Sequence, residues 1–327
     1  MRSLALVPLL AATAAFADVN SVVVDHILPR FSTFAEASTD LSEASAQDCT
    51  AEALKPSYNN AFDAWMGISH LQLGPLEQDG RALTIGFWPD KRGMVDSTVE
   101  KMVKSENAAV ASPEEFAEVS IAVRGLFALE RLLYDPELAG YGRGDYSCAL
   151  VQAISGDLAR VAGEMNAEWQ DYAKVLRTAG EPGNTEYLDK AEAAQRLYTA
   201  LLSGLEFDED SRIGRPLGTF DRPRPARAEA RRSGRSLRNV VLSLEALRDL
   251  ARALSDRPIP KVEAAFDTAL QQAAELEDPV FASVDDPMGR LKVEVLGQSI
   301  GFVREAVEGE IGAALNLTAG FNSADGD

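Results

Sequence analysis

The sequence predicts an all-α protein made of two antiparallel helical bundles with long, ordered loops. Alanine, leucine, glutamate and arginine dominate the chain, and all four have high helix propensity. Apolar residues recur with a period near 3.6, which is typical of amphipathic helices, and no stretch sustains the alternation expected of a strand. These observations favour helices throughout the chain.

The expected helices are long and are separated by turn-forming residues. In order, they cover residues 20–44, 51–73, 96–107, 113–134, 148–179, 185–204, 228–254, 260–276 and 288–315. Turns with proline or glycine follow several of them: Gly74-Pro75, Asp135-Pro136, Gly180-Glu181-Pro182-Gly183, Arg257-Pro258-Ile259-Pro260 and Asp286-Pro287. Ser112 begins the fourth helix as an N-cap, with Pro113 at the first helical position and Glu115 completing a capping box. Long helices with short connections indicate antiparallel bundles.

Two connections, residues 74–95 and 205–227, are too long to be simple turns. Both are rich in glycine and proline, and long ordered loops between rigid helices are often functional. The second loop is the better place for a domain boundary. We therefore predict an N-terminal bundle over residues 18–204 and a C-terminal bundle over residues 205–327.

Residues 1–17 have the features of a secretory signal peptide. Arg2 supplies the positive start, an apolar run extends from Leu4 to Phe16, and Ala15-Phe16-Ala17 forms a small-x-small cleavage site. A buried N-terminal helix is the alternative. No later stretch is long and apolar enough to span a membrane. We expect an exported, periplasmic protein that is cleaved after Ala17.

The chain is strongly acidic. Its formal net charge is −19, and it becomes −20 when Arg2 leaves with the signal peptide. A protein with this charge repels nucleic acid and anionic membrane surfaces. We therefore expect no nucleic-acid partner.

Cys49 and Cys148 are the only cysteines, and export permits a disulfide between them. Such a bond would close a loop of about a hundred residues, which the chain-entropy model values at ~4–5 kcal/mol. Two free, buried thiols are the alternative.

Glu130 interrupts an apolar stripe. The stripe of the 113–134 helix consists of Phe116, Val119, Val123, Leu126, Glu130 and Leu133, at spacings of 3, 4, 3, 4 and 3. A buried, unpaired carboxylate costs much free energy, so Glu130 needs an arginine, a metal or a ligand group as partner. The alternative is a partly exposed glutamate at the edge of the stripe, paired with Arg131 or Arg124.

An arginine cluster is the second strong signal. Nine arginines stand at positions 212, 215, 222, 224, 227, 231, 232, 235 and 238, against Asp221 and Glu229, which gives a local charge of 9 − 2 = +7. In the helix expected from residue 228, Arg227, Arg231, Arg235 and Arg238 would share one face. Guanidinium groups suit carboxylates and phosphates. The cluster therefore predicts either an anion-binding wall or neutralisation of acidic helices in the other bundle.

Weaker candidates lie around the first long loop. His70 would share a helix face with Asp63, and such a pair can bind a metal or orient a proton shuttle. A packed or solvated histidine is the alternative. Glu77 and Asp79 are candidate oxygen ligands for a metal.

Trp88-Pro89-Asp90 predicts a rigid aromatic corner that either has a packing role or lines a cleft.

Motifs of common enzymes are absent, including His-Glu-x-x-His, Gly-x-Ser-x-Gly and the phosphate-binding glycine loop. Motifs therefore do not assign a reaction.

Several of these residues carry a family resemblance. Gly125, Glu130, Leu132, Leu133 and Tyr134 match a helical Gly-x-His-x-x-Glu signature followed by Leu-Leu-Tyr/Phe. Further matching segments are Trp65 to Gly74-Pro75, Trp88-Pro89-Asp90, Arg232-Ser233-Gly234-Arg235-Ser236-Leu237 with Asn239, and the end from Gly320 to Asp327. The chain thus resembles the imelysin-like proteins over most of its mature length. One departure stands out, because the signature histidine is Phe127 here.

The resemblance implies two helical bundles and two possible activities. The family is named after a metallopeptidase assignment, and other members are linked to iron uptake in the bacterial envelope. A hydrolytic zinc site usually takes three protein ligands, mostly His or Cys. With Phe127 in the signature, only His26 and His70 remain in the chain, and carboxylate-only sites favour harder ions. The peptidase is therefore the second interpretation.

Our first interpretation is an exported imelysin-like protein that binds a ligand between its bundles and does no covalent chemistry. The expected ligand-binding residues are Glu130, Trp88, Asp90, Arg231, Arg235, Arg238 and Asn239, and the candidate metal ligands are Glu130, His70 and Glu77. The resemblance suggests iron or another divalent or trivalent metal. The arginines suggest a ligand with carboxylates or phosphates, such as a ferric chelate or haem, with Glu130 organising Arg235 or Arg238. A scaffold that docks other envelope proteins is the third interpretation.

Overall fold

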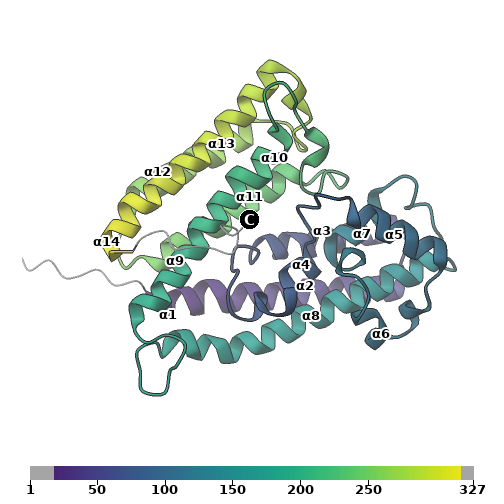
Figure 1. The fold of residues 1–327 in the computed structure, drawn as a ribbon, viewed down its shortest axis with the longest axis horizontal. Coiled ribbons are helices and arrows are strands. Elements are labelled where there is room, and N and C mark those ends of the chain that lie inside the picture. Colours follow the sequence, from purple (N-terminus) through teal and green to yellow (C-terminus); the bar gives the residue numbers. More distant parts are fainter. Residues whose placement is uncertain (1–17, 318–327) are drawn as a thin grey trace, which may run out of the picture.

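The computed structural model describes residues 18–317, and regular structure in this range is helical (Figure 1). The α-helices are α1 Val19–Ser21, α2 Leu28–Gln47, α3 Ala51–Met66, α4 Arg81–Ile85, α5 Met94–Ser105, α6 Pro113–Ala117, α7 Gly125–Tyr134, α8 Tyr146–Arg177, α9 Lys190–Glu206, α10 Gly214–Leu217, α11 Ser236–Leu254, α12 Pro260–Glu275, α13 Pro287–Val307 and α14 Ala313–Leu315. Three π-helical segments are η1 Val22–Ile27, η6 Phe207–Ile213 and η9 Glu308–Gly312. Short 3₁₀ turns are η2 Gly74–Leu76, η3 Gln78–Gly80, η4 Ala108–Ala111, η5 Ile121–Val123, η7 Pro225–Arg227 and η8 Ala282–Asp285. The predicted all-α class is confirmed.

The first group of helices is built on α2 and α8. These two long helices pack along each other, with α3 and α7 beside them (Figure 1). Fully buried aromatic rings join them, and Phe31 of α2 lies 4.9 Å from Trp169 of α8 between ring centroids. A disulfide between Cys49 and Cys148 ties the chain after α2 to the first turn of α8. The predicted disulfide is therefore confirmed.

The second group contains α9, α11, α12 and α13 (Figure 1). Here α12 packs on α13, and both α11 and α13 pack against α9. The predicted boundary after residue 204 falls inside a helical run, because α9 continues through η6 into α10 without a loop. The expectation that residues 205–227 form one long loop is wrong over residues 205–217. As a division into domains, the boundary stays a prediction.

The helix expected over residues 113–134 is broken between α6 and α7. Ser120 caps η5 by accepting a hydrogen bond from the Ala122 N–H, and Gly125 then adopts φ +68°. A Cβ at Gly125 would lie 2.2 Å from the carbonyl oxygen of Thr84, so only glycine allows α7 to begin against α4. The apolar stripe thus belongs to two helices, and Glu130 lies on the second.

Two other expected helices are shorter than predicted. The helix expected from residue 228 begins at Ser236, because Ala230 and Gly234 take positive φ values of 45° and 73°. Arg227 and Arg231 therefore lie in turns, and the single face of four arginines is wrong. Likewise α3 ends at Met66, so His70 lies in the turns that follow this helix. The expectation that His70 shares a helix face with Asp63 is therefore wrong.

Within residues 18–317, no helix combines the length and apolar character that a bilayer crossing requires. Residues 1–17, where the signal peptide is expected, lie outside the described range.

Candidate ligand-binding cleft

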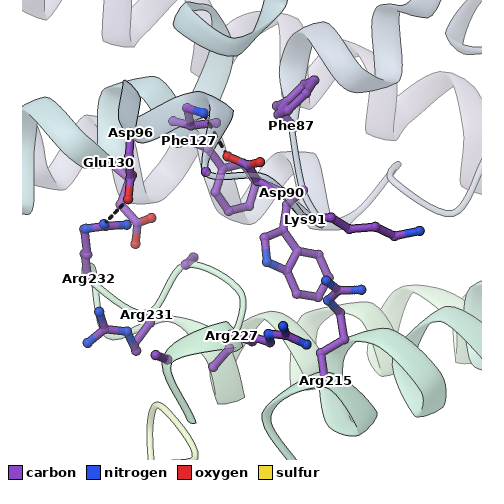
Figure 2. Close-up of a pocket in the computed structure, with 16 residues that line it drawn as sticks. Phe87, Asp90, Lys91, Asp96, Phe127, Glu130, Arg215, Arg227, Arg231 and Arg232 are labelled. Carbon is purple, nitrogen blue, oxygen red and sulfur yellow. Dashed lines mark hydrogen bonds and ion pairs between the residues drawn. The ribbon is translucent and has the colours of Figure 1, made fainter. Parts of the chain in front are cut away.

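A cleft of about 480 Å³ lies between the two helical groups. The loop after α4, the start of α5 and two residues of α7 form one side, and α10 with the segment from residue 226 to 232 forms the other (Figure 2). The residues used below are Trp88, Asp90, Lys91, Asp96, Phe127 and Glu130 on the first side and Arg215, Arg227, Arg231 and Arg232 on the second.

The first side is held in place by Asp90 and Trp88. The Asp90 carboxylate accepts hydrogen bonds from the backbone N–H groups of Arg92, at 3.1 Å, and Val95, at 2.8 Å. These two hydrogen bonds fix the loop to the first turn of α5. The Trp88 ring packs edge-on against Phe207 of η6, with 5.8 Å between centroids, so the loop also contacts the second helical group.

Glu130 is only 3% exposed, and its partner is Ser233. Its Oε1 accepts hydrogen bonds from the backbone N–H and the hydroxyl of Ser233, both at 2.8 Å. Burial raises the pKa of Glu130, while the Ser233 donors and the positive charge of Arg232 act in the opposite direction. The predicted burial is thus confirmed. The expected pairing of Glu130 with Arg235 or Arg238 is wrong.

The alternative for Glu130 is also wrong, because both neighbouring arginines have other partners. Arg131 binds Asp96, Glu100 and Asp135. Arg124 forms a buried pair with Asp157 of α8, at 2.7 Å.

A buried ion cluster anchors the second side of the cleft. The Arg212 guanidinium donates to Asp208, at 2.5 Å, and to Glu229, at 2.8 Å. Asn239, an expected ligand contact, donates to the same Glu229 oxygen at 3.0 Å and is fully buried. Burial raises the pKa of Asp208 to about 6. Because Glu229 lies inside the segment that lines the cleft, this cluster positions the arginines on either side of it.

Four cationic side chains of the cleft form no ion pair, although the charge of Arg231 acts on Glu130 and lowers its pKa. Within residues 18–317, no carboxylate lies within ion-pair distance of Lys91, Arg215, Arg227 or Arg231. Arg215 lies over the Trp88 ring, 5.8 Å from its centroid. Burial and the neighbouring charge of Arg227, on the same side of the cleft, lower the pKa of Arg215.

Arg232, by contrast, is neutralised. Its guanidinium donates to Asp96, at 2.9 Å, and to Asp135, at 3.2 Å. The cleft therefore combines one ion-paired arginine with four unpaired cations.

The other expected arginine contacts lie outside the cleft. Arg235 donates to the side-chain oxygen of Asn59, at 2.6 Å, and also pairs with Asp63. Arg238 pairs with the same Asp63. Of the predicted ligand-binding residues, Trp88, Asp90, Glu130 and Arg231 line the cleft, whereas Arg235, Arg238 and Asn239 do not.

The three expected metal ligands are bound to different partners. Glu130 accepts from Ser233, and Glu77 accepts from Arg196 at 2.6 Å. His70 is buried against His26, with 3.0 Å between their Nε2 atoms. The part of the chain from 18 to 317 contains no group of three or more His, Cys, Asp or Glu placed to hold a metal ion.

The hydrogen bonds of the His26–His70 pair define its protonation. Arg30 Nε donates to His26 Nδ1 at 3.2 Å, so His26 must donate from Nε2 to His70 Nε2. The proton of His70 then lies on Nδ1, which has no partner among the described residues. Burial lowers the pKa of both rings, that of His70 to about 3.

Sequence patterns predicted only part of the cleft. Arg215 and Arg227 were counted in the arginine cluster, but neither was named as an expected ligand contact. One local signal was present, because Arg212 has Asp208 four residues before it, whereas Arg215, Arg227 and Arg231 have no acidic residue three or four positions away. The signal is incomplete, since Arg235 also lacks a local acid and finds Asp63 at long range.

The fold and the cleft define this chain as an all-α protein with a cationic, ligand-sized cleft between its two helical groups. The family model for imelysin (Peptidase M75) matches residues 27–301, and the chain belongs to the imelysin family. No curated protein matches it significantly.

Two solved structures are similar in fold. An imelysin-like protein from Psychrobacter arcticum 273-4 superposes with a TM-score of 0.77 at 19% identity, covering 94% of this chain and 100% of its own. A protein from Parabacteroides distasonis ATCC 8503, assigned as an iron-regulated protein A precursor, has a TM-score of 0.68 at 11% identity, with coverage of 90% and 97%. At these identities the likeness shows the shared fold alone.

Proposed function

We propose that this protein is an exported binding protein that takes up an anionic iron chelate in the cleft and does no covalent chemistry. The observation that carries the proposal is the group of four unpaired cations, Lys91, Arg215, Arg227 and Arg231, at one cleft. The chain as a whole has a net charge of −19. Unpaired positive charges gathered in such a chain favour an anion as their missing partner.

The two sides of the cleft would make different contacts with the ligand. The guanidinium groups of Arg227 and Arg231 offer bidentate hydrogen bonds to carboxylate or phosphate oxygens. Trp88 offers an aromatic surface next to Arg215, and Phe127 adds another on α7. Glu130 would act through Ser233, because its carboxylate holds the turn that carries Arg231 and Arg232.

The iron assignment rests on the family. One similar structure is of a protein assigned as an iron-regulated precursor. Export is supported by the Cys49–Cys148 disulfide, because disulfides persist in oxidising compartments such as the periplasm.

A directly bound metal ion fits the cleft poorly. Its carboxylates already accept hydrogen bonds or ion pairs: Asp90 from backbone N–H groups, Asp96 from arginines and Glu130 from Ser233. A cation would also meet four unpaired positive charges. We therefore propose that the chelator binds the metal and that the protein binds the chelate.

A thermal-shift screen of residues 18–327 tests the proposal. The panel contains ferric citrate, citrate, phosphate, haem, Fe²⁺, Fe³⁺, Zn²⁺ and Ca²⁺, because a ligand that binds only the folded state raises the melting temperature. We expect a shift with ferric citrate that Arg227→Ala removes. The control is Arg222→Ala, which deletes the same charge from an exposed residue outside the cleft.

Other outcomes would replace the proposal. A shift with bare metal that is lost only in Glu130→Ala, together with chelator-sensitive cleavage of unfolded substrates, would support the peptidase. No shift with any compound, together with capture of one envelope protein at low salt, would support a scaffold.

A further inference from the structure

The unpaired cations of the cleft come from both helical groups. Lys91 belongs to the loop after α4, whereas Arg215, Arg227 and Arg231 belong to the opposite side (Figure 2). A ligand with a single anionic group would leave one side uncompensated. A ligand that contacts both sides must therefore carry several separated anionic groups.

The same residues disfavour haem as the ligand. Haem iron is held in proteins by the side chains of His, Met, Cys or Tyr. None of the described residues that line the cleft is of these four types. The two histidines of the chain are buried against each other elsewhere.

They also disfavour direct coordination of iron by the protein. Glu130 is the least exposed carboxylate of the cleft, and its Oε1 already accepts two hydrogen bonds from Ser233. The Asp96 carboxylate is shared between Arg131 and Arg232. The carboxylates of the cleft are thus already engaged with protein donors, so an iron ion in this cleft would take most of its ligand atoms from elsewhere.

We infer that the ligand is a compact, coordinatively complete polyanion with at least three negative charges, held by Lys91 on one side and the three unpaired arginines on the other. The protein contacts the outer oxygen atoms of the chelator and makes no bond to the metal. This inference rests on the proposed function and specifies its ligand class.

An exchange-inert complex separates this inference from direct coordination. Tris(oxalato)chromate(III) is a trianion whose metal is enclosed by oxalate and does not exchange ligands on the time scale of a titration. We expect calorimetric titration of residues 18–327 to show that it binds, and that hexaamminecobalt(III), a trication, does not. If exchange-labile ferric citrate binds and the chromium complex does not, the protein must bond to iron and the inference is wrong.

A carboxylate series tests the charge requirement. We expect affinity to fall about ten-fold for each carboxylate removed from citrate to succinate to acetate. Arg227→Gln and Lys91→Gln should each weaken citrate binding about ten-fold, with one substitution on either side of the cleft. Arg222→Gln should leave the affinity unchanged, because Arg222 is exposed and makes only backbone hydrogen bonds.

Different results would overturn the proposed function and the inference about the ligand class. If succinate binds as tightly as citrate and Arg227→Gln weakens both, anion binding in the cleft stands and the requirement for three charges is overturned. If Lys91→Gln has no effect while Arg227→Gln does, binding from both sides is overturned. If no anion binds at all, the proposed function fails and this inference with it.

Discussion

Glu130 on α7 and Ser233 in the turn before α11 join the two helical groups through one carboxylate oxygen. Both the backbone N–H and the hydroxyl of Ser233 donate to Oε1, each at 2.8 Å. The contact connects residues 103 positions apart in the sequence. It fixes the turn that presents Arg231 and Arg232 to the cleft.

Ser233→Ala should destabilise the protein by about 2 kcal/mol, because hydrogen bonds to a buried charged group contribute more than neutral ones. The backbone donor remains, so the fold should be retained. Urea unfolding measures the change, with Ser32→Ala on the surface of α2 as control. Equal stability of the two variants would show that the Ser233 hydroxyl does not support Glu130.

Gly125→Ala should be strongly destabilising, by about 3 kcal/mol or more, because it combines a positive φ with a steric clash. The added Cβ would lie 2.2 Å from the Thr84 carbonyl oxygen. Gly163→Ala in α8 is the matched control, since no atom outside the backbone of its own helix lies within 4 Å of its Cβ position. That variant should gain about 0.5–1 kcal/mol from helix propensity. Similar melting temperatures for both would contradict the junction described for α4 and α7.

The His26–His70 pair should make the protein less stable in acid. Both rings have a folded-state pKa below the ordinary value, that of His70 about 3. As pH falls below about 6.5, the histidines of the unfolded chain bind protons, whereas those of the folded protein stay neutral. The free energy of unfolding therefore decreases from pH 6.5 toward pH 3. For His70 this loss is about 2 kcal/mol between pH 6.5 and 5.

The comparison of wild type with His70→Asn isolates this effect. Asp208, whose folded pKa is about 6, acts in the opposite direction, because the folded protein takes up its proton before the unfolded chain does. That contribution is present in both proteins and cancels in the difference. Parallel plots of unfolding free energy against pH for the two proteins would refute the assignment.

Phe127→His should create a metal site that the wild type lacks. An imidazole at position 127 and the Glu130 carboxylate are three positions apart on α7, a spacing that places both on one helix face. Zn²⁺ at a hundred times its dissociation constant would stabilise the folded state by about 2.7 kcal/mol. Thermal shift with Zn²⁺ detects this, and the double substitution Phe127→His with Glu130→Gln should abolish it. A zinc shift of the same size in wild type would mean that position 127 is not the missing ligand.

Long-range contacts explain why only part of the cleft was predictable. Glu130 was recognised because an acid in an apolar stripe is a local pattern, but its partner comes from a distant turn. Arg235 and Arg238 have the same local features as Arg231. They differ only because α3 brings Asp63 within reach of them and not of Arg231.

The sequence by itself determined the all-α class and the order of the long helices, and it marked Glu130 as an acid in an apolar stripe. Helix propensity, periodicity and turn residues act over a few positions, so they can be read along the chain. Tertiary structure alone decided that α7 begins at Gly125 against Thr84, that His26 pairs with His70, and which arginines remain unpaired. These depend on contacts between segments far apart in sequence, where the geometry of packing decides which charge meets its partner.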